Sequence, residues 1–412
     1  MFRIMTTAIT LSVLLIAGTA MAADSPQFRG PNRDGNFAET DLMKAWPEGG
    51  PALIWKAEGI GFGYASVSIV GDTIYVPGMM DDNQGYLTAL DLAGQPKWKV
   101  AYGEETQNKQ GPGSRSTPTI DGDRVYLLSG PGVLSCMSAK DGAIVWQVNI
   151  MERFAGKVVD WVQAESVLVD GDRVYCTPGG PDASVVALNK MTGETIWTSK
   201  GLSDASAYCS PNIIDHNGRR ILVTMTAKLV VGIDPASGAV LWTHEHPTDY
   251  DIHAVTPVYE KGMLYYTAGY KSGGGMLELA ADGASVTPKW RDENLDCQHH
   301  GVVLLDGYIY GTTHQSGREM LCLELATGKV MWRTGDIRQG AVVYADGMLY
   351  VYEGPSAGVV SLVTATPEKF ERTGSFTIEE GEGNHWAHPV VAGKRLYIRH
   401  GALLFAYDIA AK

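Results

Sequence analysis

Tryptophan recurs along this chain with a nearly constant spacing. Successive tryptophans are separated by 42 to 51 residues, and the seven in this series are Trp55, Trp98, Trp146, Trp197, Trp242, Trp290 and Trp332. A regular period of this length is typical of one supersecondary unit copied many times, in which each copy buries its apolar face against its neighbours. The repeat therefore constrains the fold more strongly than any single residue does.

The last six of these tryptophans end a shared short phrase. Its fullest copy is Ala-Leu-Asn-Lys-Met-Thr-Gly-Glu-Thr-Ile-Trp at residues 187–197, and related copies occupy residues 232–242 and 322–332. One whole unit, residues 116–146, contains four short apolar runs separated by Asp-Gly and Gly-Pro-Gly turns. The predicted unit is a twisted sheet of four antiparallel strands.

The beginning of this unit, a tight turn followed by a strand, occurs eight times. The strands contain Tyr75, Tyr126, Tyr175, Ile221, Tyr265, Tyr310, Tyr350 and Tyr397. No amphipathic helix of any length separates the copies, so the sequence predicts an all-β fold. Four-stranded sheets arranged around an axis bury their faces and leave only short edges. We therefore expect an eight-bladed β-propeller rather than an open solenoid, which would expose apolar terminal faces.

The two ends of the propeller are predicted to complete one blade together. The eighth unit, residues 388–408, stops after its third strand, whereas residues 51–56 supply a strand that precedes the first complete hairpin. We expect this N-terminal strand to pair with the last blade and close the ring. Residues 51–412 then form the propeller, and residues 23–50 form an N-terminal extension.

Residues 1–22 have the layout of a secretory signal peptide. A basic start at Arg3 precedes an apolar run at residues 9–17 and a small-residue cleavage site at residues 20–22. The apolar run is too short to span a bilayer comfortably. We therefore expect a periplasmic or secreted monomer without a membrane span after cleavage. The net charge of −13 argues against nucleic acid as a partner.

The cysteines carry no recognisable metal or haem motif. The five are Cys136, Cys176, Cys209, Cys297 and Cys322. No two are adjacent and no Cys-x-x-Cys occurs, so zinc ligation and covalent haem attachment are unsupported. Cys136 and Cys322 stand at the repeat position of Ala187, which indicates packing in the core.

The repeated phrase resembles the tryptophan-docking motif of the pyrroloquinoline-quinone (PQQ)-like β-propellers. That superfamily includes the quinoprotein alcohol dehydrogenases and the periplasmic propellers of the BamB type. The resemblance covers nearly all of residues 23–412 and implies that each tryptophan stacks between neighbouring blades. Residues 28–31, Phe-Arg-Gly-Pro, also resemble the opening of small secreted members. The seventh unit departs from the pattern, because Phe376 stands roughly where its tryptophan is expected.

Aligning the units on their turns places a set of polar and aromatic residues at one mouth of the central channel. The candidate ligand-binding residues are Tyr64, Arg115, Gln163, Glu165, Tyr208, His253, His299, His300, Arg338, His385 and His388. The two arginines could pair with a carboxylate or quinone-like ligand. The histidines could hold a metal, although their pairs lack an established metal spacing, so no metal site is predicted. A water-filled polar channel mouth would have the same composition.

Acidic residues recur a few positions before this ring. They are Asp160, Asp204, Asp251, Asp296, Asp336 and Glu382. Several carboxylates on one rim could bind calcium, but aspartates in loops more often form turns.

Two functions remain open from the sequence. In the first, the protein is a non-catalytic binding or scaffolding module that recruits a protein or peptide partner in the cell envelope. In the second, the resemblance implies a PQQ-dependent oxidoreductase that acts on an alcohol or sugar, with Arg115, His253, His300 and His385 around the quinone. The family's calcium ligands, aspartate base and adjacent cysteines find no match here, so the first function is favoured and the cofactor is unassigned.

Overall fold

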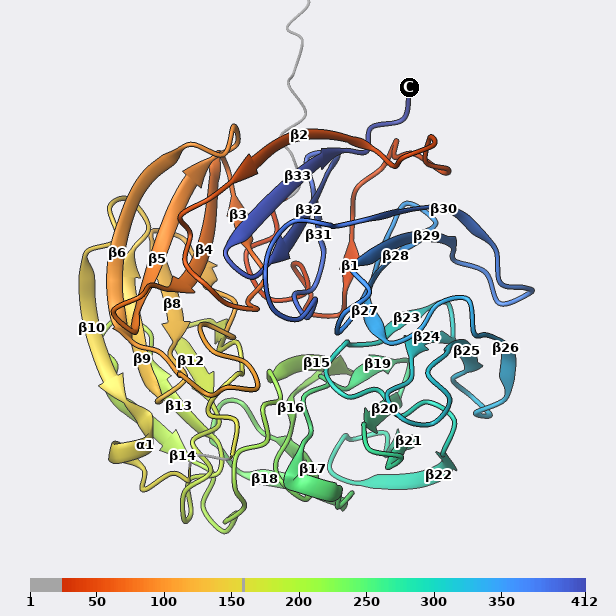
Figure 1. The fold of residues 1–412 in the computed structure, drawn as a ribbon. Helices are drawn as coiled ribbons and strands as arrows, with labels where there is room; N and C mark the ends of the chain where they lie inside the picture. Colours follow the sequence, from red (N-terminus) through yellow and green to blue (C-terminus); the bar gives the residue numbers. More distant parts are fainter. Residues whose placement is uncertain (1–23, 158–159) are drawn as a thin grey trace, which may run out of the picture.

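Eight sheets surround a central axis in the computed structural model, which describes residues 24–157 and 160–412 (Figure 1). The eight-bladed all-β propeller predicted from the repeats is confirmed. Each blade consists of four antiparallel strands that follow one another in chain order from the axis outwards, with two exceptions: blade 7 gains β1 (Asn36–Phe37) as a fifth strand, and blade 8 takes its outermost strand, β2 (Ala52–Ala57), from the N-terminal part of the chain. The predicted signal peptide, residues 1–22, lies outside the described residues.

The first four blades follow the repeat without interruption. Blade 1 contains β3 (Ser68–Val70), β4 (Thr73–Met79), β5 (Gln84–Asp91) and β6 (Pro96–Glu104). Blade 2 contains β7 (Thr119–Asp121), β8 (Arg124–Leu128), β9 (Val133–Ser138) and β10 (Ile144–Asn149), followed by the short helix α1 (Ile150–Arg153). Blade 3 contains β11 (Leu168–Asp170), β12 (Arg173–Cys176), β13 (Val186–Asn189) and β14 (Thr195–Thr198). Blade 4 contains β15 (Asn212–His216), β16 (Arg219–Met225), β17 (Leu229–Ile233) and β18 (Val240–Glu245), followed by the 3-10 turn η1 (Asp249–Asp251).

The last four blades include both N-terminal strands. Blade 5 contains β19 (Val258–Glu260), β20 (Met263–Ala268), β21 (Gly273–Leu279) and β22 (Val286–Asp292). Blade 6 contains β23 (Val303–Leu305), β24 (Tyr308–Thr312), β25 (Met320–Glu324) and β26 (Val330–Thr334). Blade 7 contains β27 (Gly340–Ala345), β28 (Met348–Glu353), β29 (Val359–Thr364) and β30 (Arg372–Thr377), with β1 (Asn36–Phe37) added parallel to β27. Blade 8 contains β31 (Val390–Ala392), β32 (Arg395–His400), β33 (Leu403–Asp408) and β2 (Ala52–Ala57).

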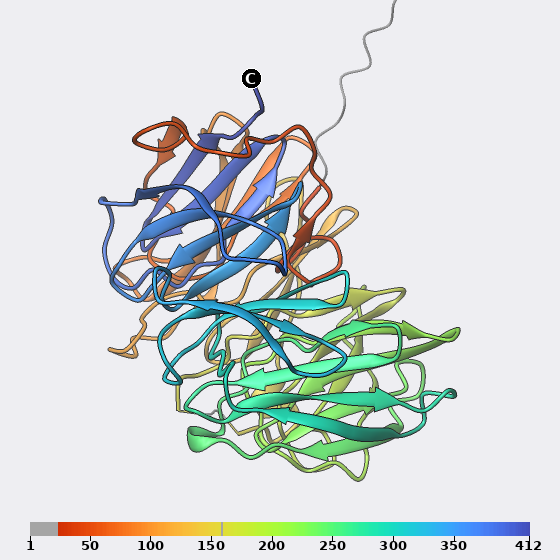
Figure 2. The ribbon, with the colours of Figure 1, turned by 90° about the vertical axis from the view of Figure 1, so that its right-hand side faces the viewer.

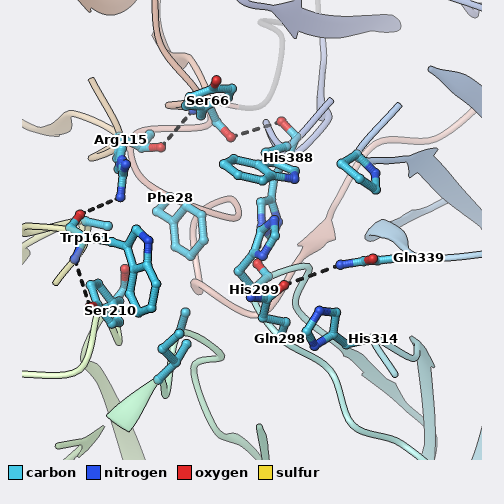
Figure 3. Close-up of a pocket in the computed structure, with 18 of the residues that line it drawn as sticks. Phe28, Ser66, Arg115, Trp161, Ser210, Gln298, His299, His314, Gln339 and His388 are labelled. Atoms are coloured by element: carbon cyan, nitrogen blue, oxygen red, sulfur yellow. Dashed lines mark hydrogen bonds between the residues drawn. The ribbon is translucent and has the colours of Figure 1, made fainter. Parts of the chain in front are cut away.

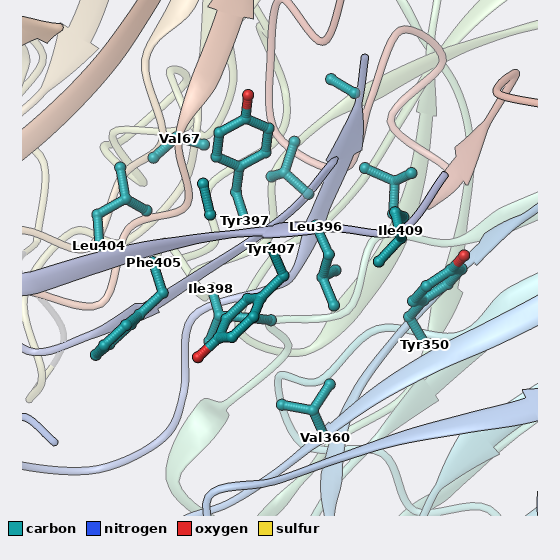
Figure 4. Close-up of a cluster of buried hydrophobic side chains, with 14 of the residues drawn as sticks. Val67, Tyr350, Val360, Leu396, Tyr397, Ile398, Leu404, Phe405, Tyr407 and Ile409 are labelled. Atoms are coloured by element: carbon teal, nitrogen blue, oxygen red, sulfur yellow. The ribbon is translucent and has the colours of Figure 1, made fainter. Parts of the chain in front are cut away.

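The ring is closed by the N-terminal strand, as predicted. Strand β2 pairs antiparallel with β33, with Ala52 opposite Asp408 and Ala57 opposite Leu404. Strands β2 and β33 therefore lie side by side, and the red N-terminal and dark-blue C-terminal segments meet at the top of the molecule in Figures 1 and 2. Around this closure, apolar side chains of blades 7 and 8 form a buried cluster that includes Tyr350, Val360, Leu396 and Phe405 (Figure 4).

The tryptophans bridge neighbouring blades in the way the resemblance implied. The Trp197 indole Nε1 donates to Pro235 O of blade 4 at 3.1 Å, and Trp146 Nε1 donates to Lys190 O of blade 3 at 3.0 Å. The glycine of the phrase makes room for this contact, because a Cβ on Gly193 would lie 2.8 Å from the Trp146 ring. Trp55, Trp290 and Trp332 donate in the same way.

Blade 7 departs from the expectation that Phe376 replaces its tryptophan. In blade 6, Tyr310 pairs with Cys322, which pairs with Trp332; the corresponding row of blade 7 is Tyr350, Leu362 and Gly374. The space above this glycine is filled by Trp46 of the N-terminal extension. A Cβ on Gly374 would lie 2.8 Å from Trp46 Cβ, and the Trp46 and Tyr350 rings are 6.1 Å apart, like those of Tyr310 and Trp332.

Among the residues that the structure describes, no helix combines the length and the apolar character needed to cross a bilayer.

Candidate functional site

A cavity of about 450 Å³ occupies one mouth of the propeller, where the chain enters the innermost strands (Figure 3). Because each inner strand begins at this mouth, the residues just before it project side chains toward the axis. The lining residues are Phe28, Tyr64, Ser66, Gln110, Arg115, Thr117, Trp161, Ala164, Tyr208, Ser210, Ile252, Ala254, Tyr270, Gln298, His299, His314, Gln339, Pro355, Trp386 and His388. The cavity thus draws on loops of all eight blades and on the N-terminal extension.

The floor of the cavity is formed by the N-terminal extension. Residues 25–37 enter the channel from the opposite mouth, where Ser25 pairs with Ile69, and return along blade 7 as β1. The tip of this loop carries Phe28, which lines the cavity between Trp161 and His299 (Figure 3). Residues 28–31, the Phe-Arg-Gly-Pro segment that resembles the opening of small secreted propellers, therefore lie in a plug inside the channel. We call residues 25–37 the plug.

Two buried arginines hold the plug in place. Arg29 donates to Val302 O at 2.6 Å and to Val342 O at 3.1 Å, and thus joins blades 6 and 7. Arg33 donates to Val167 O at 3.2 Å and to Ser166 O in blade 3. Burial lowers the pKa of both guanidinium groups to about 10, so both stay protonated at neutral pH. Charged donors therefore satisfy backbone carbonyls that the inner strands leave unpaired.

Aromatic rings surround the cavity in close succession. The rings of Tyr64 and Trp386 are 5.0 Å apart, and those of Tyr270 and His314 are 4.6 Å apart. Tyr250 extends this wall outwards, at 5.1 Å from Tyr270 and 6.2 Å from Trp161. The Tyr250 residue is 63% exposed and has a φ of 66°, an uncommon backbone conformation for a bulky residue. The mouth therefore presents an aromatic rim to solvent.

The polar groups of the lining are mostly uncharged. Among the described residues that line the cavity, none is Asp or Glu. Burial lowers the pKa of His299 to about 3, and it also lowers the pKa of His314 and of His388. These imidazoles are neutral at pH 7, which leaves Arg115 as the charged group of the lining. Its guanidinium donates to Gly111 O and Trp161 O.

The hydrogen bonds of His388 define its tautomer. Its Nε2 lies 2.9 Å from His299 O, a carbonyl that can only accept, so Nε2 carries the proton. Its Nδ1 lies 3.0 Å from Arg29 Nη1 and accepts from that guanidinium. The plug and the cavity wall are thus joined through a neutral imidazole.

The structure brings together five of the residues proposed from the sequence alignment of the units. Tyr64, Arg115, Tyr208, His299 and His388 line the cavity. The other six, Gln163, Glu165, His253, His300, Arg338 and His385, lie outside the lining.

Several of these six are engaged in the walls between blades. Glu165 is fully buried and accepts from Thr177 N at 2.8 Å, and His253 Nδ1 donates to Thr226 O at 2.8 Å. His385 Nδ1 lies 2.5 Å from the Tyr352 hydroxyl. The Arg338 side chain is exposed.

The unit alignment missed most of the aromatic wall. Phe28 comes from the plug, Trp161 and Tyr270 come from loops of irregular length, and Tyr250 comes from the 3-10 turn η1. Trp161 does not stand at the docking position of the repeated phrase. That departure was the signal in the sequence that could have pointed to this residue.

Two of the acidic residues considered as calcium ligands, Asp204 and Asp296, instead organise loops. Asp296 accepts from the backbone N–H groups of Lys271, His314, Gln315 and Ser316 at 2.9 to 3.1 Å. Asp204 accepts from Thr226 Oγ1 at 2.7 Å and Lys228 N at 2.9 Å. No cluster of three His, Cys, Asp or Glu side chains suited to a metal occurs in residues 24–157 and 160–412.

Comparison with known proteins places this architecture in a family. A sequence model of the family described as outer membrane protein assembly factor BamB matches residues 83–334. This protein belongs to that family. The match spans the tryptophan phrases of blades 1 to 6, which are the repeats that bridge neighbouring blades.

Two kinds of relatives share sequence with this BamB-like chain. A quinoprotein ethanol dehydrogenase from Pseudomonas aeruginosa is 26% identical over 159 residues, covering 36% of this chain and 25% of that protein. BamB from Moranella endobia is 27% identical over 188 residues, covering 43% of this chain and 45% of that protein. The chain thus spans about a quarter of the dehydrogenase and under half of this BamB relative.

Solved structures share the fold. BamB from Moraxella catarrhalis superposes with a TM-score of 0.63 at 15% identity, covering 87% of this chain and 97% of that one. Quinohemoprotein alcohol dehydrogenase from Comamonas testosteroni superposes with a TM-score of 0.69 at 12% identity, covering 95% of this chain and 81% of that one.

The cavity does not fit the calcium–quinone pair that the dehydrogenase resemblance implies. Calcium takes carboxylate and carbonyl oxygens in its coordination sphere. The described lining contains no carboxylate, and Asp296, next to the lining residues of blade 6, already accepts from backbone N–H groups. An anionic quinone would find one guanidinium, that of Arg115, which already donates to two carbonyls.

Proposed function

We propose that this protein is a non-catalytic binding module of the cell envelope that holds its ligand at the aromatic mouth of the propeller. The observation that carries this proposal is a cavity with an aromatic wall, a floor made by Phe28, and no carboxylate among the described lining residues. Concave, largely apolar sites with a few fixed polar groups are the usual form of ligand pockets.

The cavity is built for recognition more than for reaction. A PQQ-dependent oxidoreductase of the quinoprotein dehydrogenase type is expected to need a calcium ligand and a carboxylate base, and the described lining contains neither a carboxylate ligand nor a carboxylate base. Burial lowers the pKa of His299 and of His388, so both imidazoles are neutral. Both ring nitrogens of His388 are engaged in hydrogen bonds, with Arg29 and with His299 O. The similarity to quinoprotein dehydrogenases is therefore attributed to the shared propeller.

The envelope location is supported by the relatives and by residues 1–22, which remain a predicted signal peptide. Three matching relatives are named as outer membrane protein assembly factors, from Moranella endobia, Yersinia pestis and Salmonella typhimurium. A protein or peptide partner would contact the rim around Tyr250, where a large aromatic side chain is exposed.

Comparative capture from envelope extract tests the binding function. The wild-type protein and its Trp161→Ala variant would be immobilised in parallel, and retained proteins and small molecules identified by mass spectrometry. We expect at least one component that the wild type retains and Trp161→Ala loses. If both proteins retained the same components, the mouth of the propeller would not be the binding site.

Reconstitution with PQQ and calcium tests the oxidoreductase alternative. We expect no quinone absorbance band and no dye-linked oxidation of alcohols or sugars. Activity that depends on added quinone would overturn the non-catalytic assignment.

A further inference from the structure

We infer that the cavity binds the terminal unit of a neutral glycan, inserted end-on with its sugar ring against the aromatic wall. This inference rests on the proposed binding function and names the ligand class. A sugar has an apolar C–H face and a rim of hydroxyls, so it requires a flat aromatic surface next to groups that both donate and accept.

The flat surfaces are present on several sides of the cavity. Trp161 and Trp386 contribute the two largest rings. Phe28 of the plug supplies a third, which lies between Trp161 and His299 in Figure 3. Tyr270 and exposed Tyr250 continue the surface toward solvent, with their rings 5.1 Å apart. Rigid aromatic side chains supply contact area at a low cost in conformational entropy.

The polar part of the lining matches hydroxyl groups. Three amide side chains, Gln110, Gln298 and Gln339, each offer a carbonyl oxygen and an N–H₂ group. They are held by neighbours: Gln298 Nε2 donates to the Tyr270 hydroxyl at 2.7 Å, and Gln110 accepts from the Trp161 indole. These contacts orient the amides and leave part of each group's hydrogen-bonding capacity for a ligand.

One lining group has no partner of its own. His299 Nε2 is buried and forms no hydrogen bond with any described residue. Leaving a buried polar atom unsatisfied is unfavourable, and pairing with a ligand hydroxyl would remove that cost. Because the ring is neutral, this nitrogen is suited to a hydroxyl and does not demand a charged partner.

Charge argues for a neutral ligand. A cation would enter an aromatic site that contains Arg115 and no described carboxylate, which is unfavourable despite the attraction of the rings. An anion would have to compete with Gly111 O and Trp161 O for the Arg115 guanidinium. The lining therefore favours a polyol over either kind of ion.

The plug requires end-on binding. Phe28 and Arg29 close the inner end of the cavity, so a chain cannot pass through the propeller. A volume of about 450 Å³ suits a small ligand or the end of a longer one. Further units would leave the mouth across Tyr250.

Calorimetric titration of the full mature protein with neutral trisaccharides tests this inference. The panel would contain α- and β-linked glucose, mannose and N-acetylglucosamine trisaccharides, with tetramethylammonium and benzoate as cationic and anionic probes. We expect one-to-one binding of at least one trisaccharide. Loss of one stacking ring is expected to weaken it about tenfold in Trp161→Ala, with partial recovery in Trp161→Phe.

Tyr86→Ala serves as the control, because Tyr86 lies on β5 outside the cavity lining. It should bind the sugar like the wild type. Binding of no sugar at millimolar concentration, or sugar binding unaffected by Trp161→Ala, would overturn the glycan assignment, as would binding of tetramethylammonium or benzoate alone. If capture from extract still depends on Trp161 in those cases, the binding function stands and only the ligand class fails.

Discussion

The two mouths of the propeller channel are built from the same ring of inner strands but end differently. From one mouth, residues 25–37 enter the channel, and beneath the cavity Arg29 and Arg33 donate to carbonyls of blades 3, 6 and 7. At the other mouth, aromatic rings together with amide, imidazole and hydroxyl side chains line a cavity of about 450 Å³. The interior is held by charged hydrogen bonds to the backbone, whereas the mouth above it keeps an open aromatic wall.

This difference shows how a propeller can reserve one end for binding. A central channel exposes inner-strand carbonyls that need donors, and a guanidinium can satisfy several at once. Once the plug meets that need inside the channel, the side chains at the mouth above it are free to face a ligand. The four variants below test this division, from the largest expected effect to the smallest.

Removing Arg29 should damage the plug most. The Arg29→Ala variant leaves Val302 O and Val342 O without their donor, and we expect the free energy of unfolding to fall by about 5 kcal/mol. Urea denaturation followed by circular dichroism measures this loss. Arg220→Ala, which removes a surface pair with Asp170, should cost under about 1 kcal/mol. Equal losses in both variants would contradict a special role for the plug.

Trp46 anchors the segment that follows the plug. Because its ring fills the space above Gly374 in blade 7, Trp46→Ala should lower the free energy of unfolding by about 4 kcal/mol. Trp197→Ala removes a docking tryptophan of the repeat itself and should cost a similar amount. A Trp46→Ala variant as stable as the wild type would show that blade 7 needs no docking ring.

Glu165, beside Arg33, should make stability depend on pH. Burial raises the pKa of its carboxyl from 4.5 to about 7, so the folded state holds a proton that the unfolded chain releases. Its contribution is complete below about pH 4.5 and is lost as pH rises toward 7, roughly 3 kcal/mol in all. Denaturation at a series of pH values should show a shallower decline for Glu165→Gln than for wild type. If the free energy of unfolding of Glu165→Gln declined with pH as steeply as that of the wild type, this carboxyl would not be the source of the pH dependence.

Tyr250 at the open mouth should matter least for stability. Its side chain is largely exposed, so Tyr250→Ala should change the free energy of unfolding by under about 0.5 kcal/mol. The affinity of the Tyr250→Ala variant for its ligand should nevertheless fall, because the Tyr250 ring lies next to Trp161 and Tyr270 in the wild type. Thermal unfolding and ligand titration on the same sample separate the two effects. A large loss of melting temperature would place Tyr250 in the structural core instead.

The repeats made most of the fold predictable. Each Thr-Gly-x-x-x-Trp phrase reports a strand, a turn and a contact with the next blade, and the missing strand after Asp408 pointed to β2. The exception is blade 7, where Phe376 was expected to replace the tryptophan. The chain instead supplies Trp46 from far away in sequence, and no local spacing could reveal that partner.

The candidate site was predictable only in part. Tyr64, Arg115 and Tyr208 precede inner strands in register, and they do line the cavity. His253 and Glu165 occupy similar positions in the alignment but turn into the walls between blades, where backbone groups bind them. A shift of a residue or two in an irregular loop decides which way such a side chain faces.

The order of residues along the chain was sufficient for the number of blades, their strands and their closure, because these depend on short-range patterns repeated in register. The plug, the replacement of a docking ring by Trp46, and the aromatic mouth were decided in three dimensions. Each depends on contacts between residues 24–50 and blades hundreds of residues away, or on loops that follow no period. Such contacts are selected by the space and the unpaired carbonyls that the closed ring leaves at its centre.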